Sequence, residues 1–162
     1  MSSFLDGLRE PEYLHVLLNP LPIYGLATGT LALAAALVSR SRPAILIALG
    51  IVALTAASAW PVYALGHQAY EAVNTTVDPG GQDWLEAHRH RAEGLIWTFY
   101  VLAALAAAGV GVPLRWPKTL LPLGLAALIG ALGVLGAGGY IAYAGGKVRH
   151  LEFRKEQSGT DE

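Results

Sequence analysis

The sequence of 162 residues contains no cysteine. It therefore has no disulfide bond, no zinc site with thiolate ligands, no iron–sulfur cluster held by cysteine and no covalently attached c-type haem. Charged residues are also scarce, at 14% of the chain, whereas a soluble globular domain carries roughly 25%. Together with 54% hydrophobic residues, this scarcity excludes a disordered chain, a nucleic-acid-binding protein and an ordinary soluble enzyme.

Four long stretches lack charged residues altogether, and they predict the fold class. They cover residues 13–39, 43–70, 94–114 and 119–146, with lengths of 27, 28, 21 and 28 residues. A bilayer core of about 30 Å needs about 20 residues of helix, so each stretch is long enough to cross once. We therefore predict an all-α integral membrane four-helix bundle, with helices at about 20–39, 43–70, 84–111 and 119–146. The chain 1–162 is then one membrane domain with a short polar tail at 147–162.

Prolines and glycines agree with these helices. Pro20, Pro22 and Pro43 fall in predicted first turns, where a missing N–H is tolerated. The run Asp-Pro-Gly-Gly at 78–81 predicts the turn between the second and third helices. Pro61 lies inside the second helix, where we expect it to kink the helix and free a backbone carbonyl.

Acidic residues are missing from one side of the predicted bundle. The links at 40–42 and 115–118 carry four basic residues and no acid, whereas the opposite side carries all twelve acidic residues. The positive-inside rule favours a cytoplasmic position for these two short links. We therefore predict a multi-pass protein of the bacterial inner (cytoplasmic) membrane with periplasmic termini. The basic residues of the C-terminal tail favour the reverse orientation.

All five histidines fall on the side of the termini in this topology. They are His15, His67, His88, His90 and His150. Neutral imidazole is the commonest metal ligand, and membrane haem is often held by two imidazoles from facing helices. Histidine is also tolerated at membrane interfaces as an amphipathic side chain, so a purely structural interpretation stays open.

The start of the third helix holds the richest set of candidate site residues. His88 and His90 point about 200° apart on a helix, so they cannot share one partner. Gly94 and Trp97 follow His90 on its face, a pattern that suits the edge of a porphyrin. His15, His67, His88 and His90 are the candidate haem ligands. Arg89 and Arg91 are candidates to pair with haem propionates. His15, His67, His88 and His90 are also the candidate ligands of a divalent metal, which needs three or four converging groups.

Short motifs across the chain resemble a bacterial four-helix membrane-protein family of unassigned function. The run from His15 to Ile23 is similar to the family's opening, His-Pro, two apolar residues and Val-His-Phe-Pro-Ile, with Pro20 in place of the second histidine. Three further features match the family. They are Gly66, a histidine at the start of the third predicted helix, and the Gly-Gly-x-x-x-Tyr run at 138–143. Family members are sometimes joined to Rieske or cytochrome c domains, which implies electron transfer by association. His67 is the candidate to replace the missing histidine.

These observations lead to one functional prediction and two alternatives. We predict a haem b-binding subunit that transfers electrons between the quinone pool and a periplasmic cytochrome or Rieske protein, and not a stand-alone enzyme. Because the chain lacks a sizeable extramembrane domain, we expect other subunits of a membrane complex as partners, besides membrane lipid, and no nucleic acid. The alternatives are a cofactor-free structural or assembly subunit and a divalent-metal-binding membrane protein.

Overall fold

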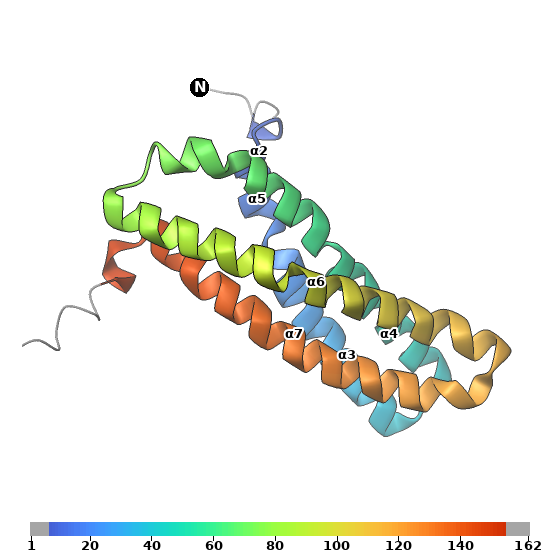
Figure 1. Ribbon diagram of the computed structural model, residues 1–162. Coiled ribbons are helices and arrows are strands. Elements are labelled where there is room, and N and C mark those ends of the chain that lie inside the picture. Colours follow the sequence, from blue (N-terminus) through green and yellow to red (C-terminus); the bar gives the residue numbers. More distant parts are fainter. Residues whose placement is uncertain (1–6, 155–162) are drawn as a thin grey trace, which may run out of the picture.

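The structure, a computed structural model, describes residues 7–154 as helices joined by short links, with no strand in that range (Figure 1). Four helical stretches are long and apolar enough to cross a membrane: Pro11–Ser39, Arg42–Asn74, Pro79–Arg115 and Pro117–Arg149. These stretches confirm the predicted all-α four-helix fold. Residues 1–6 and 155–162, which include half of the predicted polar tail, lie outside the described range.

The first crossing is built from three helical segments. These are α2 (Pro11–Leu18), a π-helical turn η1 (Leu21–Gly25) and α3 (Leu26–Ser39). Pro20 and Pro22 carry no backbone N–H, so they interrupt the regular ladder and the chain passes through a wider turn. The sequence prediction began this helix near residue 20 and left His15 outside it. That start was wrong, because the segment before the prolines is helical and carries His15.

The second crossing is divided at Ser58, three residues before Pro61. Its two parts are α4 (Arg42–Ala57) and α5 (Ala59–Asn74). A proline ring clashes with the carbonyl of the residue four positions earlier, which is Ala57 here. The Ser58 hydroxyl donates a hydrogen bond to the Thr55 carbonyl at 2.6 Å. The helix is thus divided close to Pro61, where the sequence predicts a kink.

The third and fourth crossings are long helices. They are α6 (Pro79–Arg115) and α7 (Leu120–Arg149), joined by the short turn η2 (Pro117–Thr119) and followed by η3 (Leu151–Phe153). α6 begins at residue 79, not at the predicted 84, because Asp78 caps it and Pro79 occupies its first position. The Asp78 carboxylate accepts a hydrogen bond from the Gly81 N–H at 3.1 Å.

The core lies at the centre of the bundle, and apolar side chains also cover its outside. Leu26, Leu33, Leu49 and Val52 are fully buried. Large apolar residues such as Leu31, Val38, Leu54 and Ile129 are each more than 70% exposed on the outer faces. Exposed apolar surface of this extent suits contact with membrane lipid.

Glycines bring α3 and α4 close together in this core. A Cβ atom on Gly25 would lie 2.8 Å from the Thr55 side chain, and one on Gly29 would lie 3.1 Å from Ile51. Such small-residue faces allow close helix contact where lipid provides no hydrophobic drive.

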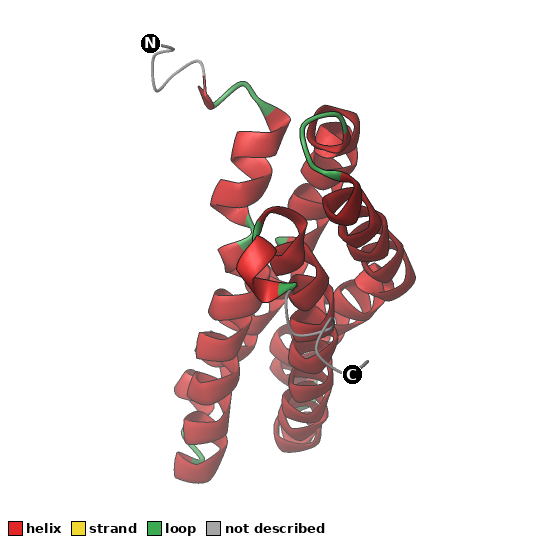
Figure 2. Ribbon diagram, turned by 90° about the vertical axis from the view of Figure 1, so that its left-hand side faces the viewer, coloured by secondary structure: helices red, strands yellow, loops and turns green. Residues whose placement is uncertain are grey.

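The bundle opens at one end. The start of α2, the end of α7 and the link between α5 and α6 lie at this end, which faces the viewer in Figure 2. Here α2 packs against α5 and α6 packs against α7, but the two pairs diverge (Figure 1). At the other end α3, α4, α6 and α7 stay in contact. The divergence leaves space between the two pairs, on the side that carries every histidine.

Arg154 fastens the end of α7 to the start of α6. Its guanidinium donates to both carboxylate oxygens of Asp78, at 2.7 and 3.0 Å, and to the carbonyls of Lys147 and Val148. The carbonyls at the end of a helix lack intrahelical partners, so this side chain caps α7. Because Asp78 caps α6, one ion pair holds the two helix ends together.

This ion pair predicts an acid-sensitive contribution to stability. The hydrogen bond from Arg154 lowers the pKa of the Asp78 carboxyl below its ordinary value of 3.8. A lowered folded-state pKa stabilises the protein above the unfolded pKa, and this contribution is lost as pH falls through the folded value. We expect the melting temperatures of wild type and Asp78→Asn to differ at pH 7 and to converge below about pH 4. A difference that stays constant or grows between pH 4 and pH 2 would contradict this assignment.

Candidate functional site

A cavity of about 770 Å³ lies between the two diverging helix pairs at the open end. Residues of α2, α5, α6 and α7 line it, and many of them are apolar, including Val16, Ala69, Leu85 and Ala142. Its volume is in the range of about 300–1,000 Å³ that is typical of small-molecule and cofactor sites. A second pocket of about 60 Å³ extends from its floor toward the core, and His15 and His88 line both spaces.

His15 lies on α2 and is held against α5. Its Nδ1 is 2.8 Å from the carbonyl oxygen of Val62, which can only accept, so Nδ1 carries the proton. The ring lies directly on Gly66, where an added Cβ would be 2.8 Å from His15 Cε1. Gly66 therefore provides the space that the imidazole occupies.

His88 repeats this arrangement on the other helix pair. It lies on α6, and its Nδ1 is 3.0 Å from the carbonyl oxygen of Ile141 on α7. An added Cβ on Gly145 would be 3.0 Å from His88 Nδ1. Each imidazole is thus fixed by one backbone carbonyl and one glycine of the neighbouring helix.

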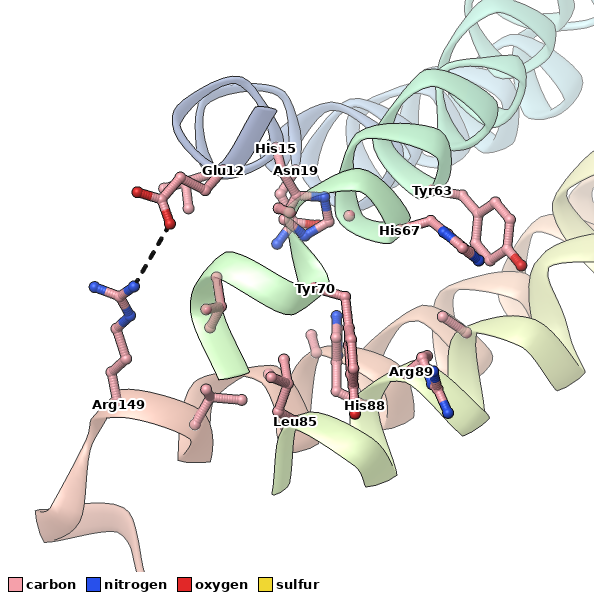
Figure 3. A pocket seen from close by; sticks show the side chains of 18 of the residues that line it. Glu12, His15, Asn19, Tyr63, His67, Tyr70, Leu85, His88, Arg89 and Arg149 are labelled. Atoms are coloured by element: carbon pink, nitrogen blue, oxygen red, sulfur yellow. Dashed lines mark ion pairs between the residues drawn. The ribbon is translucent and has the colours of Figure 1, made fainter. Parts of the chain in front are cut away.

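The two rings face each other across the floor of the cavity, with His15 on one wall and His88 on the other (Figure 3). Their centroids are 6.4 Å apart and their planes are 78° apart. Neither Nε2 has a hydrogen-bond partner in residues 7–154, and neither is a buried unpartnered atom, so both are open to the cavity space. A neutral imidazole that donates from Nδ1 presents the Nε2 lone pair, which is the form that binds a metal.

Charged side chains close two edges of the cavity. On the edge between α2 and α7, Arg149 lies 3.9 Å from Glu12 (Figure 3). Both side chains are largely exposed, so this pair stabilises the fold by under about 1 kcal/mol. Glu12 and Arg149 thus lie on opposite helices at the mouth of the cavity.

The edge between α5 and α6 is a polar network around Arg89. Its Nη2 donates to Glu86 at 2.8 Å, and the Tyr70 hydroxyl donates to the same carboxylate at 2.7 Å. The Arg89 guanidinium also stacks 4.5 Å from the Tyr70 ring centroid. Its Nε is buried without a hydrogen-bond partner in the described part of the chain, and the nearest carboxylate oxygen, on Glu93, is 3.9 Å away.

The other predicted site residues fall in three places. His67 is exposed and lines the cavity beside Tyr63 (Figure 3). His150 lines the cavity mouth and pairs with Glu152 at 2.9 Å. His90 is exposed and does not line the cavity. Arg91 does not line it either.

Of the four histidines that the sequence offers as ligands, the structure thus brings His15 and His88 together and leaves His90 outside the cavity. The direction of each helix face explains this arrangement. His88 and His90 point in different directions from α6, as the helix geometry predicts, and His88 is the one that lines the cavity. In the sequence, the features that mark this pair are Gly66 and Gly145, which lie four residues after Val62 and Ile141. Their role can be recognised only once it is known which helices pack against each other.

No group of three or more histidine, cysteine, aspartate or glutamate side chains converges within the described residues. A divalent-metal site built from protein ligands requires such convergence. A two-imidazole site is sufficient only for a group that supplies its remaining ligands itself, as a porphyrin does.

Comparison with known proteins adds no constraint on this site. No protein-family model, no curated protein and no solved structure matches the chain. The interpretation of the cavity therefore depends on its geometry.

Proposed function

We propose that this chain is a haem b-binding subunit that passes electrons between the quinone pool and a periplasmic carrier. One observation carries the proposal, namely the separation and tautomer of the His15 and His88 rings. Two imidazoles that bind one iron from opposite sides at about 2 Å have ring centroids about 6 Å apart. The observed centroid distance is 6.4 Å.

Three further features fit a haem. The carbonyls of Val62 and Ile141 fix the orientation of the rings, and such outer partners raise the basicity of a ligand imidazole. The cavity is mainly apolar, as a porphyrin requires, and its volume suits one cofactor. Arg89 and Arg149 lie at its edges, where a guanidinium can bind a carboxylate such as a propionate.

When bound there, a haem supplies one-electron transfer, and the residues of the chain orient and insulate it. Apolar side chains from α2, α5, α6 and α7 line the cavity into which the two histidines project. Glu93 and His67 also line the cavity, and they place a carboxyl group and an imidazole there. This arrangement fits a quinone that approaches from the lipid.

The position of the site suits exchange with a soluble carrier. The charge-free stretch of α6 begins at Gly94, so His88 lies about 9 Å further along the helix, at 1.5 Å per residue. This places the cavity at the level of the membrane interface and not at its centre. The proposal includes partner subunits of a membrane complex and a periplasmic cytochrome or Rieske protein.

The proposal is tested by measuring electron transfer from a quinol to the bound haem. The chain, purified from membranes with its complex, is mixed with a reduced quinone, and the haem band is recorded over time. Reduction of the band by quinol, followed by its reoxidation with a periplasmic cytochrome, supports the proposal. A complex that transfers electrons at the same rate when this chain carries no haem makes it a structural or assembly subunit instead.

Orientation in the bacterial inner membrane is a separate prediction. We propose that the cavity and both termini are periplasmic, because Arg40, Arg42, Arg115 and Lys118 lie in the two short links at the opposite end. Reporter fusions active only in the periplasm are expected to work at the C-terminus and to fail between Arg40 and Arg42. The opposite pattern would place the cavity on the cytoplasmic side and exclude a periplasmic electron carrier.

A further inference from the structure

We propose that Arg91 and Lys147 form a binding site for the phosphate group of an anionic phospholipid, on a face of the bundle that does not line the cavity. The site lies on neighbouring turns of α6 and α7. Its other components are three aromatic rings, those of Trp84, Tyr140 and Tyr143. None of these five residues lines the cavity, so the proposal is independent of haem binding.

Lys147 provides the first argument, because it is a buried cation without a counter-ion. It is 4% exposed, and its ammonium nitrogen lies 4.6 Å from the Trp84 ring centroid and 4.5 Å from that of Tyr143. Within residues 7–154 its side chain makes no ion pair or hydrogen bond. The nitrogen is also not a buried unpartnered atom, so it reaches the surface between the rings. The two rings give the ammonium group cation–π contacts but no full negative charge, so an anion at this opening would complete the site.

Arg91 provides the second positive charge next to the first. Its guanidinium lies 3.9 Å from the Tyr140 ring centroid and 6.0 Å from that of Tyr143. One nitrogen donates to the Tyr140 carbonyl at 2.9 Å, and no carboxylate pairs with Arg91 in the described chain. Its remaining N–H groups are therefore available to an acceptor. The Tyr143 ring centroid lies 6.0 Å from the Arg91 guanidinium and 4.5 Å from the Lys147 ammonium, so both positive charges gather around one ring.

The depth of the site identifies the ligand. Arg91 lies three residues before the charge-free stretch that begins at Gly94, and Lys147 directly follows the stretch that ends at Gly146. Both cations thus lie where the hydrocarbon core ends and lipid phosphates begin. Aromatic side chains gather at this level, and basic pockets between transmembrane helices bind anionic head groups. The geometry therefore favours a lipid phosphate over a soluble anion.

Lipid retention by the purified full chain tests the site. Native mass spectrometry counts the phosphatidylglycerol molecules that remain bound, and phosphatidylcholine serves as the neutral comparison. The double variant Arg91→Gln/Lys147→Gln is expected to bind phosphatidylglycerol about thirtyfold more weakly, because each basic residue at a membrane surface contributes about fivefold. The charge-matched variant Arg115→Gln/Lys118→Gln at the other end is expected to retain that lipid.

Two further arms keep the test decisive if the double variant folds poorly. Arg91→Gln alone, which leaves Lys147 and its aromatic neighbours intact, should weaken binding about fivefold, and Lys147→Arg should restore it relative to Lys147→Gln. Inorganic phosphate should not raise the melting temperature as phosphatidylglycerol does. Equal lipid retention by both double variants, or equal stabilisation by inorganic phosphate, would overturn the proposal.

Discussion

Replacing His15 or His88 by alanine is expected to remove the bound haem, whereas replacing His90 leaves it in place. His15 and His88 face each other at 6.4 Å between centroids, and each presents an unpartnered Nε2 to the cavity. Loss of partners around a ligand typically weakens metal binding about 10–100-fold, so loss of the ligand itself should weaken it at least as much. The measurement is haem content per purified chain, with the reduced-minus-oxidised spectrum.

His90→Ala and His67→Ala are the matched controls for this prediction. His90 lies two residues from His88 on α6 but does not line the cavity. His67 lines the cavity, but within residues 7–154 its ring makes no hydrogen bond to a backbone carbonyl like those of His15 and His88. Both variants should keep a six-coordinate spectrum. If His90→Ala loses the haem while His88→Ala retains it, the pairing of His15 with His88 is wrong.

Gly66→Ala and Gly145→Ala are expected to lower haem affinity although they change no ligand. An added Cβ at Gly66 would lie 2.8 Å from the His15 ring, and one at Gly145 would lie 3.0 Å from the His88 ring. Each imidazole would have to move away from the carbonyl that orients it, and we expect a loss of about 10–100-fold in affinity. Titration of haem into the purified variants measures this loss.

Gly94→Ala and Gly146→Ala are the controls for the glycine variants. Both positions are helical, and an added Cβ at either one has nothing within 4 Å. Alanine is favoured over glycine in a helix by about 1 kcal/mol, so these two variants should be as stable as wild type or more so. Equal haem affinity for Gly146→Ala and Gly145→Ala would show that the close contact with His88 has no role in ligand orientation.

The sequence was sufficient for the fold because lipid imposes a simple rule. Stretches without charge must be helical where they cross the membrane, so the four crossings followed from composition. The break at Ser58 also followed, since Pro61 removes a hydrogen bond wherever it occurs in a helix.

The arrangement of the site did not follow from the sequence because it depends on which helix faces meet. His15 appeared to precede its helix, and only the helical segment before Pro20 and Pro22 brings it to α5. Gly145 is one of several glycines in α7, and nothing in the sequence distinguishes it from Gly146. The position of Arg91 among aromatic rings of α6 and α7 likewise required the register of two helices.

The decisive measurement for haem binding is the visible absorption spectrum of the wild-type chain, purified from its native membrane with its partners. We expect a reducible b-type spectrum with the features of two imidazole ligands, at one haem per chain for the His15–His88 pair. A well-folded, colourless preparation that takes up no haem on titration would contradict it. His15 and His88 would then be structural histidines that hold the helix pairs through the carbonyls of Val62 and Ile141.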